Sequence, residues 1–241
     1  MKNFTIILFF LSISAFCQGQ DIKFKKWLIG VSYEANISSR QLKYSASNEW
    51  VKHIRNNSEL PRYGFSTGGN FRYNLDQTFS IETGLLFANR GFATKKHQLN
   101  WATPNFDFPI TSETAFAFYY IEVPLKINFN FALRKLRMYA STGVSMNYFV
   151  NRNTTLLVYN NNGDKQKTKS QQKYGYTKDT YSILLGFGMN ITISKRVLLN
   201  IEPIYIQNFT SITADNKAKE YLYSFGLNTK FFLNLKRNPN K

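Results

Sequence analysis

The sequence predicts an all-β fold, an eight-stranded antiparallel up-and-down transmembrane β-barrel, and three observations support this. Apolar and polar residues alternate with period two in eight separate segments, which is typical of strands with two unlike faces. The connections between these segments are short and long in turn, as in outer-membrane barrels. After the N-terminus, no segment reaches the roughly 18 consecutive apolar residues of a transmembrane helix.

The N-terminus predicts export. A positive charge is followed by an apolar run over Phe4–Phe16, too short to span a bilayer and typical of a signal peptide. Cys17 and Gly19 are small residues that place cleavage after Gly19, although Cys17 leaves open a lipoprotein with an atypical lipobox. The expected domains are a signal peptide over 1–19 and a single barrel over 20–241. The mature chain would have no cysteine, which excludes disulfides.

Eight segments carry the alternation. In "YYIEVPLKINFNF", every second residue from Tyr119 to Phe131 is apolar or aromatic. The eight expected strands are Trp27–Ile37, Arg62–Leu75, Thr78–Phe87, Ala115–Phe131, Leu136–Val150, Thr180–Ile193, Val197–Phe209 and Glu220–Leu233. Short periplasmic turns are expected around Asp76, Arg134 and Lys195, and long outer loops over 38–61, 90–114, 152–178 and 210–219. The even number of strands predicts that both termini lie in the periplasm.

The charged residues of the strands decide which face is the lumen. A Lys or Arg that faces lipid near the bilayer midplane costs about 2–4 kcal/mol, so the polar face points inward and the aromatic-rich face meets lipid. The bore of an eight-stranded barrel is filled by side chains, so the inward charges are expected to pair and close the lumen. The expected lumen charge network is Glu34, Arg62, Arg72, Glu82, Glu122, Lys126, Arg137, Glu202 and Lys230.

Two prolines lie within expected strands. Pro124 and Pro203 each follow a glutamate of the lumen network closely. A closed barrel has no edge strand that could tolerate a missing N–H group. We therefore expect a β-bulge at each proline, or a break in the ladder near a rim.

Catalytic and metal chemistry have little support in the sequence. The two histidines, His53 and His97, both fall in expected outer loops. His97 with Asp107 resembles a water-activating pair, but two solvated histidines are the simpler interpretation. Without cysteine the same histidines make a weak metal site. We therefore expect no enzyme, no cofactor and no metal.

The outer loops are basic and aromatic. The formal net charge is +17, and for an exported protein this favours lipopolysaccharide or anionic headgroups over nucleic acid. The third loop carries Lys165, Lys167, Lys169, Lys173 and Lys178. This loop is either mobile and solvated, or it contacts lipopolysaccharide phosphates or an anionic surface polymer. The loop aromatics Trp50, Trp101, Phe106 and Phe108 either form a binding surface or cover the barrel mouth.

The order of the strands resembles the PorT-like outer-membrane β-barrel domain family. "YYIEVPLKINF" is similar to its "YLEIPLLLKY" strand, and "FSIETGLLFANRG" to the strand before it. "MYASTGVSMNYFV" resembles its glycine-containing fifth strand, and "IEPIYIQNFTSI" with "YLYSFGLNTKFF" its final hairpin. The resemblance covers about Trp27 to Leu233 and implies an eight-stranded outer-membrane barrel without defined catalytic residues. PorT itself is associated with secretion of proteins across the outer membrane.

Two classes of function remain open. The first is a monomeric structural or surface-interaction barrel whose loops contact a surface partner or lipopolysaccharide, or whose presence supports a secretion machine. The second is a small pore or a barrel enzyme. The filled lumen disfavours the pore, and the scarcity of catalytic residues disfavours the enzyme.

Overall fold

The computed structural model describes residues 26–44, 57–102, 108–133, 136–194, 196–214 and 218–234. The signal peptide expected over 1–19 lies outside these residues, as do Trp50, His53, Phe106, Asp107, Arg134 and Lys195. The described strands are β1 (Trp27–Tyr44), β2 (Glu59–Asn74), β3 (Phe79–Thr94), β4 (His97–Gln98), β5 (Thr111–Leu133), β6 (Leu136–Tyr159), β7 (Lys165–Gln172), β8 (Asp179–Thr192), β9 (Val197–Asn208) and β10 (Ala218–Asn234). Within the same ranges, no helix is long and apolar enough to cross a membrane.

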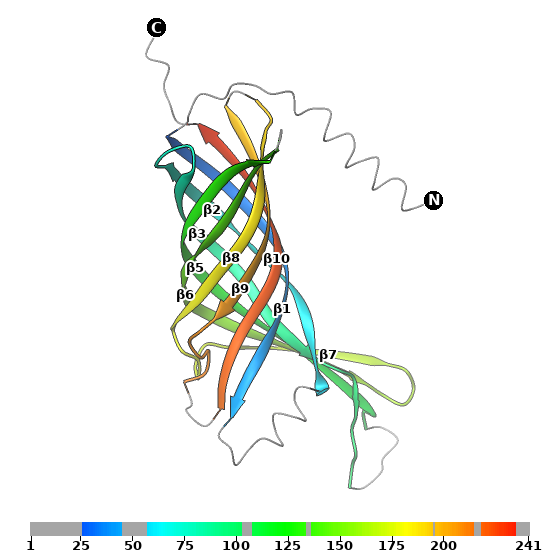
Figure 1. Cartoon of the computed structure of the whole chain (residues 1–241). Coiled ribbons are helices and arrows are strands. Elements are labelled where there is room, and N and C mark those ends of the chain that lie inside the picture. The colour runs from blue at the N-terminus through cyan, green and yellow to red at the C-terminus, as the bar shows by residue number, and fades with distance from the viewer. Residues whose placement is uncertain are drawn as a thin grey trace, which may run out of the picture.

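Eight of these strands form a closed antiparallel ring (Figure 1). Its order is β1, β2, β3, β5, β6, β8, β9 and β10, and β10 pairs with β1 to close it. The predicted up-and-down barrel is therefore confirmed. The described chain begins and ends at the short-turn end, where Asn74 and Asn234 donate backbone hydrogen bonds to Lys26 and Arg196.

Several strands extend further than the sequence predicts. β5 and β6 contain 23 and 24 residues, about twice the 9–11 that a tilted strand needs to span a bilayer. β1 and β3 also continue beyond their predicted ends, to Tyr44 and Thr94. The predicted boundaries of the first three long loops are therefore wrong. Backbone pairing continues past the apolar alternation on which those boundaries were based.

The outward face of the ring is apolar. Val31, Leu85 and Phe225 are each more than 60% exposed, and the exposed large apolar side chains come from all eight ring strands. Aromatic contacts connect neighbouring strands across this face, from Trp27 to Tyr73 at the short-turn end and from Phe87 to Tyr119 at the other. A surface of this kind is stable when lipid covers it.

A β-bulge separates the barrel from a sheet that extends beyond it. Tyr119 pairs with Asn151 and Tyr120 with Phe149, so β6 carries one extra residue, Val150. Such a bulge bends its strand. Before the bulge β6 pairs with β8, and beyond it with β7. We call β4, β7 and the outer ends of β5 and β6 (residues 111–118 and 152–159) the projecting sheet; at its base, residues 115–118 of β5 still pair with β3. In Figure 1, β7 extends sideways from the barrel.

The two strand prolines each break one ladder without changing its register. Pairing between β3 and β5 stops at Thr83–Leu125 and resumes at Leu86–Glu122, on either side of Pro124. Pairing between β8 and β9 is interrupted in the same way around Pro203. Both breaks lie beside buried lumen glutamates in mid-strand, so the expected break in the ladder is confirmed, whereas the expected bulge and the expected rim position are wrong. Thr83 Oγ1 stabilises the first break by donating to the Pro124 carbonyl at 2.8 Å.

We expect the purified protein to be heat-modifiable. A closed barrel keeps its compact shape in SDS until it is boiled, so boiled and unboiled samples should migrate differently on a gel. Circular dichroism in detergent should show β structure in the unboiled sample. A protein that remains soluble and monomeric without detergent would contradict the membrane assignment.

The barrel lumen and the projecting sheet as candidate functional sites

A chain of five charged side chains fills the short-turn half of the lumen. Arg72 Nη2 lies 2.5 Å from Glu82 Oε2, and Lys230 bridges Glu82 and Glu202, with 2.8 Å to Glu202 Oε2. Lys126 Nζ completes the chain at 2.5 Å from Glu202 Oε1. Each of the five side chains is at most 4% exposed. Buried charges are stable only when they are paired and hydrogen-bonded. This series of ion pairs therefore joins five strands, β2, β3, β5, β9 and β10.

A second charged group lies nearer the long-loop end. Both terminal nitrogens of Arg90 donate to Glu122, with 3.1 Å between Nη2 and Oε2. Glu34 Oε1 lies 4.0 Å from Arg90 and accepts a hydrogen bond from Asn36. Arg90 Nε donates to Ser224 Oγ at 3.1 Å, which joins β3 to β10 across the bore. Arg90 is therefore the counter-charge of two carboxylates, Glu122 and Glu34.

The structure places most of the expected network in the lumen, but the basic residues of the network differ from those expected. Seven of the nine expected residues are buried there: Glu34, Arg72, Glu82, Glu122, Lys126, Glu202 and Lys230. Arg62 is only half-buried and donates to Asn89 at 2.5 Å, and Arg137 is exposed. Arg90 was missed because it was assigned to a loop. With Arg90 included, four acids (Glu34, Glu82, Glu122, Glu202) balance four bases (Arg72, Arg90, Lys126, Lys230).

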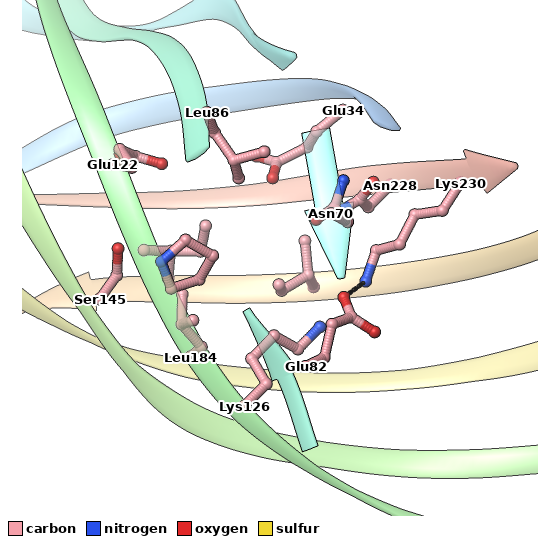
Figure 2. A pocket seen from close by; sticks show the side chains of 13 residues that line it. Glu34, Asn70, Glu82, Leu86, Glu122, Lys126, Ser145, Leu184, Asn228 and Lys230 are labelled. Carbon is pink, nitrogen blue, oxygen red and sulfur yellow. Dashed lines mark hydrogen bonds and ion pairs between the residues drawn. The ribbon is translucent and has the colours of Figure 1, made fainter. Parts of the chain in front are cut away.

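The two charged groups leave a small cavity between them. Figure 2 shows Lys126 and Lys230 beside Glu82, while Glu122 lies at the far side of the cavity. Leu86 and Leu184 contribute an apolar wall to it. The cavity volume is about 20 Å³. That is room for about one water molecule, and it is too small to admit a solute.

Lumen glycines make room for the large inward side chains. A Cβ atom on Gly186 would lie 2.5 Å from both Glu202 Oε1 and Ser141 Oγ. A Cβ atom on Gly188 would lie 2.6 Å from the ring of Tyr139. The glycines of β8 therefore allow Glu202 and Tyr139 to occupy the centre of the bore.

An aromatic plug fills the long-loop half of the lumen. We use this name for the buried cluster Phe92, Phe118, Tyr120, Phe149, Ile212 and Leu222, with Phe116 and Tyr176 packed against it. Tyr176 and Ile212 come from the connections β7–β8 and β9–β10, and Thr177 N donates to Ile212 O at 2.9 Å. Arg40 lies over the Phe92 ring at 3.8 Å and pairs with Glu59 and Glu220. These two connections therefore fold into the mouth and cover it.

Trp101 and Phe108, the two expected loop aromatics among the described residues, take no part in this cover. Trp101 and Phe108 pack against each other with ring centroids 5.0 Å apart, and they are 46% and 39% exposed. Trp101 Nε1 donates to the Pro109 carbonyl at 2.7 Å. The pair lies between β4 and β5 and is not among the residues packed in the aromatic plug, so the covering interpretation does not fit Trp101 and Phe108.

His97 lies in a cross-strand pair rather than in a catalytic array. Its Nε2 is 3.0 Å from Ser112 Oγ, and its Nδ1 faces the Lys95 carbonyl at 3.4 Å. Asp107, its expected partner, lies outside the described residues. In the described part of the chain, no group of three or more His, Cys, Asp or Glu side chains could hold a metal ion.

The third expected outer loop contains a strand. β7 carries Lys165, Lys167 and Lys169, and every residue of β7 is exposed. Lys173 and Lys178 follow it and are also exposed. Gly163, at φ 87°, makes the tight turn that joins β7 to β6, and its N–H donates to Asn160 O at 3.1 Å. Residues Lys165–Gln172 therefore form a regular, exposed strand where the sequence predicts a loop.

The fold and the lipid-type outer surface define a class, the closed β-barrels that span a membrane. Residues 18–214 match the family model described as outer membrane protein beta-barrel domain, and the chain belongs to this family. It is therefore an outer-membrane β-barrel protein. The family description is broader than the PorT-like resemblance, which stays a prediction.

Solved structures with similar strand arrangements have low sequence identity to this chain. Neisserial surface protein A (NspA) is 12% identical, with 86% of this chain and 97% of that one covered and a TM-score of 0.41. Ail, the attachment invasion locus protein of Yersinia pestis, is 11% identical, with 86% and 100% covered and a TM-score of 0.35. The outer membrane protease OmpT from Escherichia coli is 9% identical, with 90% and 99% covered and a TM-score of 0.34. No protein of curated function matches the chain by sequence.

Proposed function

We propose that this protein is a closed, non-enzymatic outer-membrane barrel with a structural or surface-interaction role. In this proposal the lumen transports nothing, and the projecting sheet on the cell surface contacts a surface partner or lipopolysaccharide. The barrel acts as a monomer with both ends in the periplasm. The observation that carries the proposal is the double filling of the lumen, by the charge network in one half and the aromatic plug in the other.

Two observations argue against the alternative functions, a pore and an enzyme. The inward charges are tied to one another in ion pairs, so they do not line a water-filled path. The Ser112–His97 pair has the residue types of a nucleophile and a base, but the second ring nitrogen of His97 meets only the Lys95 carbonyl at 3.4 Å, which is too long to orient the ring firmly. Both facts favour a role for the outer surface of the protein over a role for its interior.

A second candidate is an accessory role in an outer-membrane protein secretion system. The resemblance to PorT-like barrels supports it, and the edges of β4 and β7, to which no other described strand pairs, offer backbone groups to which a partner strand can add. Deleting the gene should then remove specific proteins from the culture medium while lipopolysaccharide and barrel assembly stay normal. Unchanged secretion would exclude this candidate.

The proposed orientation predicts which positions a membrane-impermeant maleimide reaches in intact cells. A cysteine in place of Lys167, on β7, should be labelled, because the long-loop end faces the medium. A cysteine in place of Asp76, in an exposed turn between β2 and β3, should be labelled only after the outer membrane is opened. Both positions are exposed, so the comparison reports sidedness rather than burial. The reverse pattern would overturn the orientation.

A further inference from the structure

The lysines of β7 lie in a row on one face of the projecting sheet. Lys165, Lys167 and Lys169 alternate with Gln166 and Thr168 along the strand. Successive side chains of a strand point to opposite faces, so the three ammonium groups share a face at intervals of about 7 Å. They lie opposite Tyr159, Leu157 and Thr155 of β6, which belong to the same face.

A fourth lysine, Lys96, adds to this row on the same face, next to β4 at the opposite edge of the sheet. The ring of Tyr159 lies under Lys96 Nζ at 3.7 Å and under Lys165 Nζ at 5.5 Å. The Tyr159 hydroxyl donates to Glu113 Oε1 at 2.6 Å, and this hydrogen bond raises the pKa of Tyr159. Glu113 is the acid that the register places on this face, and it is already engaged. We call Lys96, Lys165, Lys167 and Lys169 the lysine face.

The lysine face is continuous with the lipid-facing surface of the barrel. Across the sheet, Tyr159, Leu157 and Thr155 of β6 lie opposite Thr111, Glu113 and Ala115 of β5. Counting along β5 in steps of two leads from these residues to Tyr119, whose ring contacts the outward-facing Phe87 at 5.7 Å. The other face of the sheet continues into the lumen through Phe116 and Phe118. When a sheet bends outward from the barrel, its outer face turns toward the bilayer.

The position of the bend places the lysine face near the headgroups. Tyr119, Tyr148 and Tyr181 lie at the level of the bulge, since Met146 pairs with Tyr181 and Tyr119 with Asn151. Outward tyrosines of this kind mark the membrane–water interface in barrels. β7 begins to pair with β6 just beyond them, at Arg152, and extends sideways in Figure 1.

We propose that the lysine face binds the phosphate groups of lipopolysaccharide in the leaflet around the barrel, and so holds the projecting sheet over the membrane surface. This proposal rests on the proposed function for the outward orientation of the sheet. Lipid phosphates fit better than a soluble anion, because the lysines share the lipid-side face of the sheet and not the face that continues into the lumen.

The test is a titration of the mature protein in zwitterionic detergent micelles with bisphosphorylated lipid A. An environment-sensitive fluorophore on a cysteine at Gln171, which lies in the register of the lysine face, reports binding. Each basic side chain at an anionic surface strengthens attachment about fivefold, so replacing the three β7 lysines by glutamine should weaken binding on the order of a hundredfold. Dephosphorylated lipid A should bind the native protein as weakly as phosphorylated lipid A binds this variant.

A swap variant is the matched control. It carries Lys165→Gln, Gln166→Lys, Lys167→Thr, Thr168→Lys, Lys169→Ser and Ser170→Lys, so composition and net charge stay the same while the row moves to the other face. The swap should lose as much affinity as the glutamine variant, and its heat-modifiable migration should be unchanged because β7 is fully exposed. Native affinity in the swap, or equal affinity for dephosphorylated lipid A, would overturn the proposal.

Two further measurements distinguish a lipid phosphate from a soluble anion, and failure of the lipid site from failure of the proposed function. Inorganic pyrophosphate at the concentration where lipid A saturates should give little signal, and equally tight binding of pyrophosphate or of a soluble anionic polysaccharide would contradict a lipid site. The maleimide experiment tests the orientation independently. Correct labelling with no effect of the swap refutes the lipid site alone, whereas reversed labelling refutes the orientation in the proposed function.

Discussion

Replacing Glu202 by glutamine is expected to lower the free energy of unfolding by about 3–5 kcal/mol, because it leaves buried cations without their counter-charge. Glu202 accepts a hydrogen bond from Lys126 and one from Ser141 Oγ at 2.6 Å, and it forms an ion pair with Lys230 at 2.8 Å. Without the carboxylate, Glu82 alone must balance Arg72, Lys126 and Lys230. The measurement is the urea midpoint of the protein in lipid vesicles, followed by tryptophan fluorescence, with the slope checked for constancy.

The matched control for Glu202→Gln breaks the same ion pair from its other side. Lys126→Met leaves Glu202 paired with Lys230, and it brings the charges of the short-turn group to two acids and two bases. Because no carboxylate or cation of the group is then left without a counter-charge, the loss should be about 1 kcal/mol, on the order of one hydrogen bond. Equal losses in the two variants would contradict the shared, bridging role of Glu202.

Replacing Arg90 by glutamine is expected to have a similarly large effect in the other half of the lumen. Arg90 is the cation that faces both Glu122 and Glu34, so its removal leaves two buried carboxylates opposite each other. The expected loss is again about 3–5 kcal/mol in the same urea assay. Adding Glu122→Gln should recover part of this loss, because the double variant carries one buried acid fewer.

Arg62→Gln is the control for Arg90→Gln. Arg62 is half-buried and its terminal nitrogen donates to Asn89, so the same substitution should cost less than about 1 kcal/mol. If Arg62→Gln destabilised the barrel as much as Arg90→Gln, the network predicted from the sequence would be the better description and the one from the structure would be wrong.

The alternation of residues was enough to predict the ring, and strand parity was enough to place most of its charges. A period of two assigns every residue of a regular strand to one face, so Glu82 and Glu202 were placed in the lumen without coordinates. The same parity, continued from Glu82 along β3, would also have placed Arg90 inside. It was missed because the apolar residues stop alternating near Phe87, whereas the strand continues to Thr94.

β7 was missed for a different physical reason. Its sequence, "KQKTKSQQ", has no apolar face, because both of its faces meet solvent. The signal that could have revealed it is the Asn162–Gly163 turn followed by strict alternation of lysine with uncharged residues, which is typical of a solvent-exposed hairpin. The bulge at Val150 could not be predicted, because register depends on the partner strand.

The contents of the outer mouth were also beyond the sequence. Tyr176 and Ile212 lie in polar connections far apart in the chain, and only the closed ring brings them together over Phe118 and Phe149. Trp101 and Phe108 were equally plausible covers on composition alone. Their positions are decided by β4 and the outer end of β5, which extend beyond the barrel.

Planar-bilayer recording tests the central claim, a barrel closed along its whole lumen, most directly. The native protein, inserted at a density verified by its heat-modifiable band, should show no steady conductance, because the charge network and the aromatic plug close the bore in series. Phe118→Ala should still show none, since the network beneath the plug is intact. A stable open channel of porin size in the native protein would contradict the account and make the pore the leading function.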